Sequence, residues 1–299
     1  MSRTAVSTAP ADTAVKQAAR RAAGAVATGA PARVLERLGR AGLLPAPVWR
    51  HLPALIPVDL DLGSRTVSLV LPDHDGVARQ LLWRGRHAEE WFTIDAVLDG
   101  ARRGTVVDVG SNAGLMTVAA AAVGAKVFAF EPVPRSFAWT QENLDRNGLA
   151  GRCRLSPLAV ADTVGTATFH VPFGDAPSSA SLSTDGFRGL DGELIDVGVT
   201  TLDAVGLPAG IALVKIDVEG HEPEVLAGAE HVIATDRPDL VLEVNHDGPW
   251  EALDAWLAGH DYVARRLDGS EEILASVRTR PDDPYRNIRC TPAERTISR

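Results

Sequence analysis

The stretch VVDVGSNAGLMTVAAAAVGAKVFAFEP, residues 106–132, decides the fold. It opens with a β-branched run, turns through residues 110–114, continues as an apolar helical segment to Gly124 and ends in a second apolar strand before Glu131. An acidic residue about 20 positions after the first glycine of such a strand–turn–helix–strand unit is typical of the nucleotide-binding halves of doubly wound sheets. The stretch therefore predicts a nucleotide-like ligand at the turn.

The turn lacks the glycine pattern of a dinucleotide site. That pattern, GxGxxG, needs a glycine two positions after the first, where the backbone approaches the pyrophosphate, and this sequence has Asn112 there. Asp108, at the strand end, would repel a diphosphate. S-adenosylmethionine instead carries an ammonium and a sulfonium that a carboxylate attracts, and a ribose whose hydroxyls can donate to Glu131. The pattern favours this methyl donor over NAD. An NAD(P)-dependent Rossmann oxidoreductase and a non-catalytic Rossmann scaffold are the alternatives.

The composition of the 299 residues is that of an ordinary soluble protein, with 45% hydrophobic and 23% charged residues. The net charge of −9 argues against nucleic acid as the main partner. The longest apolar run, residues 115–125, is too short to span a bilayer. The two cysteines, Cys153 and Cys290, form neither a disulfide framework nor a metal-ligand spacing, so we expect a cytoplasmic protein.

Apolar strands alternate with helices along the rest of the chain, which predicts a mostly parallel sheet covered on both faces. Asp108, Glu131, Asp217 and Glu243 all follow or end such strands. Because ligands bind beyond the carboxyl ends of the strands in open α/β sheets, we expect these four acids to surround the ligand. Elsewhere the pattern predicts a hairpin of 67–71 with 78–83, strands at 152–159 and 166–171, a loop at 174–193 and one helix over 223–234.

A second motif, LVKIDVEGHEPEVLAGA at 213–229, resembles the FkbM-type methyltransferases, which are S-adenosylmethionine-dependent enzymes known chiefly for O-methylation of sugars and polyketide-like natural products. The resemblance extends over roughly residues 104–245 and includes DVGSNAG, FEPVPRSF, ENLDRNG, AVAD and KIDVEGHE. It implies a Rossmann-like class I methyltransferase fold, with a seven-stranded sheet whose last strand is antiparallel and a small-molecule hydroxyl as methyl acceptor.

With this resemblance the chain divides into four expected segments. Residues 1–50 form a basic, alanine-rich tail and helical cap, with eight basic and two acidic residues. Residues 51–103 supply a hairpin and a helix, 104–275 the methyltransferase domain, and 276–299 a C-terminal strand or tail. The flanks match nothing in the family, so we expect substrate choice to reside there.

The resemblance also assigns candidate cofactor residues. It places Asp108, Gly110, Ser111, Asn112 and Gly114 along the methionine moiety. It places Glu131, followed by Pro132, at the ribose, and the segment Ala159, Val160 to Asp162 at the border of the adenine.

Catalysis of O-methylation benefits from a base with a pKa near neutrality, since an aliphatic hydroxyl is a poor nucleophile. Histidine meets this condition without a large shift of its pKa, which makes His221 or His246 the candidate base. Asp217, Glu219 and Lys215 would orient the base or the substrate, and a buried carboxylate is the alternative base. A Mg²⁺-dependent variant would use the oxygens of Asp217, Glu243 and Asn245.

Overall fold

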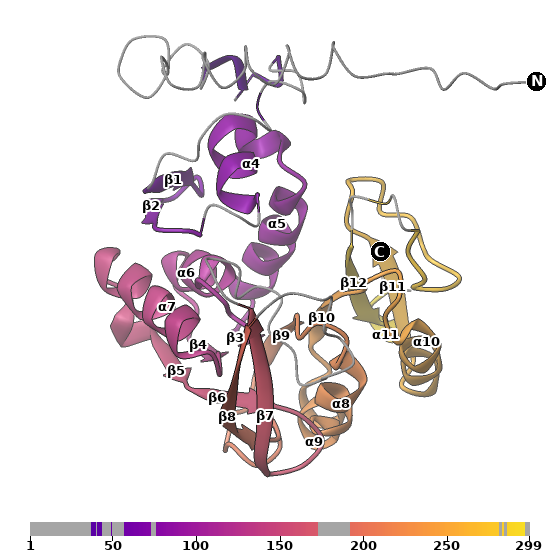
Figure 1. Cartoon of the computed structure of the whole chain (residues 1–299). Coiled ribbons are helices and arrows are strands. Elements are labelled where there is room, and N and C mark those ends of the chain that lie inside the picture. Colours follow the sequence, from indigo (N-terminus) through magenta and orange to yellow (C-terminus); the bar gives the residue numbers. More distant parts are fainter. Residues whose placement is uncertain are drawn as a thin grey trace, which may run out of the picture.

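The computed structural model describes residues 37–39, 41–43, 49, 57–72, 76–172, 192–280, 283 and 286–296. Most of the basic N-terminal segment, and most of the expected loop at 174–193, lie outside these residues. None of the helices in this part of the chain is long and apolar enough to cross a membrane. The elements, arranged as in Figure 1, are β1 (Val58–Asp61), β2 (Thr66–Leu69), α4 (Val77–Arg84), η1 (Gly85–His87), α5 (Glu90–Ala101), β3 (Thr105–Val109), α6 (Leu115–Ala122), β4 (Val127–Phe130), α7 (Pro134–Arg146), η2 (Ala150–Arg152), β5 (Cys153–Ser156), β6 (Leu158–Val160), β7 (Gly165–Pro172), β8 (Gly192–Thr200), β9 (Ile211–Ile216), α8 (Glu222–Ala227), α9 (Glu230–Asp236), β10 (Asp239–Glu243), α10 (Trp250–Gly259), β11 (Tyr262–Arg266), β12 (Asn287–Pro292) and α11 (Ala293–Thr296).

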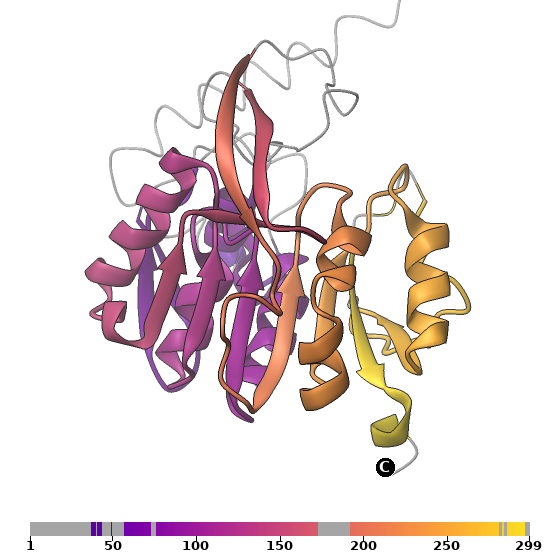
Figure 2. The same cartoon turned by 90° about the horizontal axis from the view of Figure 1, so that it is seen from below.

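Seven strands form the main sheet, in the order β11-β12-β10-β9-β3-β4-β5. The strands from β10 to β5 in this order pair in parallel, whereas β12 pairs antiparallel with both β10 and β11. Figure 2 shows β12 running against its neighbours. The seven-stranded, mostly parallel sheet with an antiparallel last strand is thus confirmed, and that last strand comes from the segment after residue 275.

The side chains of the central strands pack against helices on both faces of the sheet. On β3, Val106 packs with residues of α4 to α7, whereas Val107 and Val109 pack with residues of α8 to α10. On β9, Leu213 joins the first cluster and Val214 the second. Because successive residues of a strand point to opposite faces, strands buried on both sides need near-continuous apolar runs. This is the pattern that predicts the covered sheet.

A second, smaller sheet has the order β6-β8-β7. We expected one strand over 152–159, but β5 ends at Ser156 and β6 begins at Leu158. Pro157 lies between them and has no N–H to continue a ladder. The strand expected at 166–171 is confirmed as β7, and β8 includes the last residues of the segment expected to be a loop. Figure 2 shows β7 and β8 projecting beyond the carboxyl ends of the main strands.

Two further local predictions were wrong. The segment 78–83 is not a strand but part of α4, where Ala78 and Leu81 are buried at a helical spacing, and β2 pairs with β1 instead. The helix expected over 223–234 is two helices, α8 and α9. Gly228 ends α8, at a position where a Cβ would lie 2.0 Å from the carbonyl oxygen of Ala161. The Asp203 carboxylate then accepts hydrogen bonds from two backbone N–H groups at the start of α9, at 2.9 and 3.0 Å.

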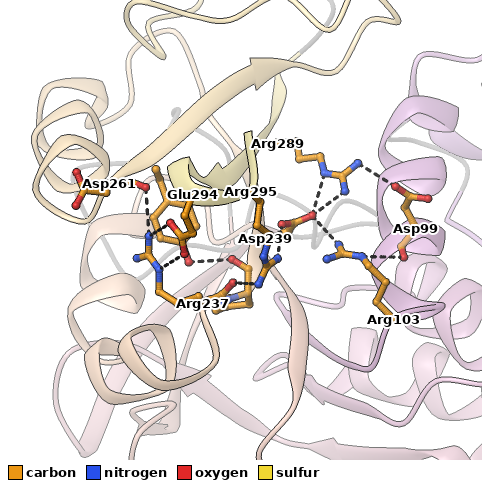
Figure 3. A network of polar contacts seen from close by, with 10 residues as sticks. Asp99, Arg103, Arg237, Asp239, Asp261, Arg289, Glu294 and Arg295 are labelled. Atoms are coloured by element: carbon orange, nitrogen blue, oxygen red, sulfur yellow. Dashed lines mark hydrogen bonds and ion pairs between the residues drawn. The ribbon is translucent and has the colours of Figure 1, made fainter. Parts of the chain in front are cut away.

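A buried carboxylate fixes the end of β12 that lies far from the carboxyl edge of the sheet. Asp239, which is 2% exposed, accepts hydrogen bonds from Arg103 at 2.6 Å, Arg289 at 2.7 Å and Arg295 at 3.0 Å. Arg289 also reaches Asp99 on α5 at 3.2 Å. Figure 3 shows these groups converging from α5, β10, β12 and α11. The cluster joins the C-terminal strand to the core.

Replacement of Asp239 with Ala should lower the free energy of unfolding by about 3–5 kcal/mol, because it leaves three guanidinium groups without their shared partner. Urea unfolding followed by circular dichroism measures this loss. The exposed residue Asp261 is a matched control, since only its backbone carbonyl contacts Arg237, and Asp261→Asn should change the stability by no more than about 0.5 kcal/mol. Equal effects of the two substitutions would contradict the role given to Asp239.

Candidate active site

The turn after β3 requires glycine at its first position. Gly110 has a φ of +78°, and a Cβ there would lie 1.9 Å from the carbonyl oxygen of Asp217. The backbone N–H groups of Gly110 and Ser111 both donate to the carbonyl oxygen of Phe130, at 3.0 and 3.1 Å. The turn is therefore pressed between the ends of β4 and β9, and it exposes the residues that follow to the space above the strands.

A cavity of about 380 Å³ lies at this carboxyl edge, a size within the usual range of small-molecule sites. All four strand-end acids line it, which confirms that the sheet brings them together. The predicted residues that line it are Asp108, Gly110, Ser111, Asn112, Glu131, Pro132, Ala159, Val160, Lys215, Asp217, Glu219 and Glu243.

Glu131 is buried at 5% exposure and its carboxylate is held by the backbone. One oxygen accepts the N–H of Asn112 at 2.8 Å, and the other accepts the N–H of Val133 at 2.9 Å. Burial nevertheless raises the pKa of Glu131 to about 7, since the backbone donors offset only part of the desolvation. Each oxygen keeps a second acceptor site for a ligand hydroxyl.

Polar atoms around the glycine turn are buried without partners in the described residues. Asp108 is 1% exposed and one of its oxygens accepts the Thr117 hydroxyl at 2.6 Å, but its Oδ1 has no hydrogen bond. The Ser111 hydroxyl and the Asn112 side-chain oxygen are in the same condition. Buried polar atoms are normally satisfied, so these three suit a ligand that brings its own donors. Burial also raises the pKa of Asp108.

Lys215, Asp217 and Glu243 form a charged group at the ends of β9 and β10. The Lys215 ammonium donates to Asp217 at 2.9 Å. Burial alone would lower the pKa of Lys215, but the carboxylates of Asp217 and Asp108 raise it, so the lysine stays charged. Burial raises the pKa of Asp217, but the Lys215 charge and the hydrogen bonds with Glu243 and Lys215 together lower it, and the net shift is downward.

The carboxyl group of Glu243 interacts with that of Asp217. The Asp217 charge, together with burial, raises the pKa of Glu243 well above its ordinary value. The raised pKa favours the protonated form of Glu243, which can donate a hydrogen bond to the Asp217 carboxylate. The side chain of Asp217 remains 34% exposed toward the cavity. The charge of one carboxyl group disfavours ionisation of the other, so the pair favours a single negative charge.

Two of the expected cofactor residues do not line the cavity. Gly114 precedes α6 with a φ of +79°, and a Cβ there would lie 2.9 Å from the Thr140 side chain. Asp162 is exposed beyond β6, where it accepts the Thr163 hydroxyl at 3.3 Å. Spacing along the chain cannot separate these residues from their neighbours that do face the ligand.

The two candidate histidines also lie outside the cavity lining, which contains no histidine among the described residues. His221 precedes α8, with its Nδ1 3.9 Å from Glu224. His246 follows β10 and is 41% exposed, with its Nδ1 3.7 Å from Asp247. Of the two bases expected from the sequence, the carboxylate is therefore the one that faces the cavity.

The proposed metal ligands come together only in part. Asp217 and Glu243 meet, but the Asn245 side-chain oxygen accepts a hydrogen bond from Arg286 at 3.0 Å and does not line the cavity. Among the described residues, no group of three or more His, Cys, Asp or Glu side chains could hold a metal ion. The third oxygen of the expected Mg²⁺ set is thus engaged elsewhere.

Several lining residues escaped sequence reasoning. Phe169 lies on β7 and lines the cavity. The sequence showed only that it stands between two polar residues of a predicted strand, which does not indicate a cavity. Glu90 begins α5 and contributes to the field on Lys215. Arg286 and Asn287 come from the C-terminal strand region, where no apolar run marks a strand. These residues come from segments whose packing only the fold reveals.

Comparison with known proteins agrees with this geometry. The family model for the methyltransferase FkbM domain matches residues 108–264. The chain is 35% identical to the 31-O-demethyl-FK506 methyltransferase FkbM of Streptomyces tacrolimicus over 54% of this chain and 74% of that protein. It is 32% identical to the hexuronic acid methyltransferase AglP of Haloferax volcanii over 51% of this chain and 62% of that protein.

A solved structure, the methyltransferase FkbM from Methylobacillus flagellatus, is 19% identical, with a TM-score of 0.43 over 63% of this chain and 43% of that one. The sheet order, the glycine turn and the acidic strand ends define an S-adenosylmethionine-dependent methyltransferase with a Rossmann-like fold. The chain belongs to the FkbM methyltransferase family.

Proposed function

We propose that the chain transfers the methyl group of S-adenosylmethionine to a hydroxyl of a small molecule, such as a sugar or a polyketide-like product. The observation that carries this proposal is the cavity with four strand-end acids and three unpartnered polar atoms around one glycine turn. A cationic ligand with hydroxyl and amine donors suits this lining, whereas the diphosphate of NAD(P) does not. The names of the two relatives, one for a demethylated FK506 and one for a hexuronic acid, support the acceptor class.

The cofactor would lie over β3, β4 and β6. Glu131 would accept the ribose hydroxyls, Asp108 would attract the ammonium and the sulfonium, and Ala159 and Val160 would border the adenine. S-adenosylmethionine supplies an activated methyl group on sulfur, and the electron pair of the broken bond remains on that sulfur. The residues of the chain position the acceptor in line and exclude water, which accounts for much of the rate in such reactions.

The Asp217–Glu243 pair would accept the acceptor's proton. The lowered pKa of Asp217 favours its charged form, and the side chain faces the cavity. The hydroxyl proton becomes strongly acidic as the new oxygen–carbon bond forms, so it can pass to the Asp217 carboxylate in spite of this low pKa. Glu243 keeps its own proton and its hydrogen bond to Asp217. The Lys215 ammonium donates a hydrogen bond to the Asp217 carboxylate at 2.9 Å, and this contact orients the carboxylate and favours its charged form.

The proposal is tested by incubating the full chain with S-adenosylmethionine that carries a deuterated methyl group and with the small-molecule extract of a strain that lacks the gene. We expect one component of the extract to gain the labelled methyl group. This component should be the compound that accumulates in the deletion strain and that is one methylene lighter than the product of the parent strain. Labelling of none of the extract components, with no S-adenosylhomocysteine formed, would overturn the proposal. Excess EDTA in a parallel reaction removes any Mg²⁺ and decides the metal alternative.

A further inference from the structure

The first residue of β12 faces the cavity beside the carboxyl pair. Asn287 is the register partner of Glu243 in the antiparallel pair of β12 with β10. Directly opposed residues of antiparallel strands point to the same face with Cβ atoms about 4.5–5.5 Å apart. Both side chains line the cavity. A carboxamide therefore stands next to the carboxyl pair that would receive the proton.

The Asn287 side-chain oxygen is buried and has no hydrogen-bond partner among the described residues. A buried carbonyl without a partner costs free energy, and this cost is removed when a ligand donates to it. The residue lies outside the range matched by the family model, residues 108–264. Its unpartnered oxygen therefore marks a contact that a bound ligand would complete.

Asn287 lies too far from β3 and β4 to contact a cofactor bound over these two strands. In the sheet order, β12 is separated from β3 by β10 and β9. Three strand spacings place it about 14 Å from β3, on the side away from β4. Asn287 thus belongs to the half of the cavity in which the acceptor would lie.

The position of Asn287 is fixed from both ends of its strand. The residue before it, Arg286, accepts the Val244 N–H through its carbonyl at 2.8 Å and donates to Asn245 at 3.0 Å. At the far end, Arg289 and Arg295 bind the buried Asp239 (Figure 3). These contacts fix the backbone that carries the Asn287 carboxamide relative to β10.

We propose that Asn287 is an acceptor-positioning residue that binds a second hydroxyl next to the one that is methylated, so that the site selects polyhydroxylated acceptors. This inference rests on the proposed methyl transfer. A carboxamide both donates and accepts, as a hydroxyl does, whereas the neighbouring carboxyl pair serves the reacting oxygen. Asn287 lies one cross-strand distance from Glu243, which interacts with the Asp217 base, so it can contact a second hydroxyl of an acceptor whose reacting hydroxyl faces Asp217. A mono-alcohol leaves Asn287 unsatisfied.

The test compares trans-1,2-cyclohexanediol and methyl α-glucopyranoside with cyclohexanol as acceptors, and follows S-adenosylhomocysteine formation by wild type and by Asn287→Leu. Leucine keeps the shape of asparagine and removes both polar atoms. We expect kcat/KM for the polyols to fall about tenfold or more, mainly through KM, while the value for cyclohexanol changes by less than about twofold. Asn287→Ser, which restores a donor and an acceptor, should recover part of the loss.

Ile288→Val is the matched control, because it alters the next residue of the same strand, which is buried on the opposite face. It should leave the polyol-to-alcohol ratio unchanged. Equal losses for polyols and cyclohexanol would overturn the inference, as would a wild-type chain that binds S-adenosylhomocysteine but methylates neither polyol. Failure to bind S-adenosylhomocysteine would instead overturn the proposed function, so the two failures are distinguishable.

Discussion

Replacement of Asp217 with Asn is expected to lower the turnover number for methyl transfer by about 10²–10⁴-fold, the usual contribution of a general base. Asparagine keeps the shape of the side chain but cannot accept the hydroxyl proton, and it loses the charge that Lys215 holds at 2.9 Å. Glu243→Gln should cost less than about tenfold, because glutamine can still donate a hydrogen bond to the Asp217 carboxylate as the protonated glutamate does. Initial rates with saturating cofactor measure both effects.

Controls for this prediction are available on the same fold. Glu251→Gln changes an exposed acid in the first turn of α10 and should leave the turnover number unaltered. His221→Gln and His246→Gln should each retain turnover within about twofold, since neither side chain lines the cavity. A tenfold or larger loss on replacing either histidine, with Asp217→Asn near wild type, would return the base to the histidine.

Glu131→Gln is expected to weaken S-adenosylhomocysteine binding by about 100-fold, since hydrogen bonds to a charged acceptor contribute about 1.5–3 kcal/mol each. Glutamine also turns an NH₂ group toward one of the two backbone N–H groups that the carboxylate accepts, those of Asn112 and Val133. Isothermal titration calorimetry gives the dissociation constants. Glu142→Gln, on the exposed side of α7, is the matched control and should bind like wild type.

The pH dependence of this binding follows from the same residue. Burial raises the pKa of Glu131 to about 7, and ribose hydroxyls donate to the ionised form. Wild-type affinity should therefore be about tenfold weaker at pH 6 than at pH 8, and Glu131→Gln should lose most of this difference. An identical pH profile for wild type and variant would show that Glu131 does not bind the ribose.

The stability of the free chain should change with pH in the opposite sense. A carboxyl group whose folded-state pKa lies above its unfolded value binds more protons when folded, so it favours folding at low pH. The contribution of Glu131 is present below about pH 4.5 and is lost as the pH rises to about 7. Ionisation of this residue thus costs stability that the bound ligand can restore.

The main sheet and the part of the cavity around the glycine turn could be predicted from the sequence. Residues 105–109 and 211–216 are continuous apolar runs because their strands are buried on both faces, and their ends carry the acids that meet above the sheet. The glycine turn was equally readable, since the clash that a Cβ at Gly110 would cause allows no other residue. Local pattern and global packing agree in this part of the chain.

The part of the cavity beside β12 was not predictable in the same way. The strand β12 is polar at every second position and is stabilised by the buried Asp239 cluster. One member of this cluster, Arg103, lies 136 residues from Asp239 in the sequence. No local pattern reports such distant pairing, so Asn287 was missed. The sequence left the choice between a histidine and a carboxylate as base open for a related reason. Sequence proximity put His221 near the motif, but the turn into α8 leaves it outside the cavity lining.

We infer that the carboxylates at the edge of the sheet bind a cationic methyl donor and not a diphosphate. Calorimetric titration of the full chain with S-adenosylhomocysteine, S-adenosylmethionine and NAD tests it directly. We predict saturable binding of the first two ligands at one site, about 100-fold weaker binding of both by the Glu131→Gln variant, and no heat with NAD. Saturable binding of NAD, or of none of the three ligands, would contradict this inference.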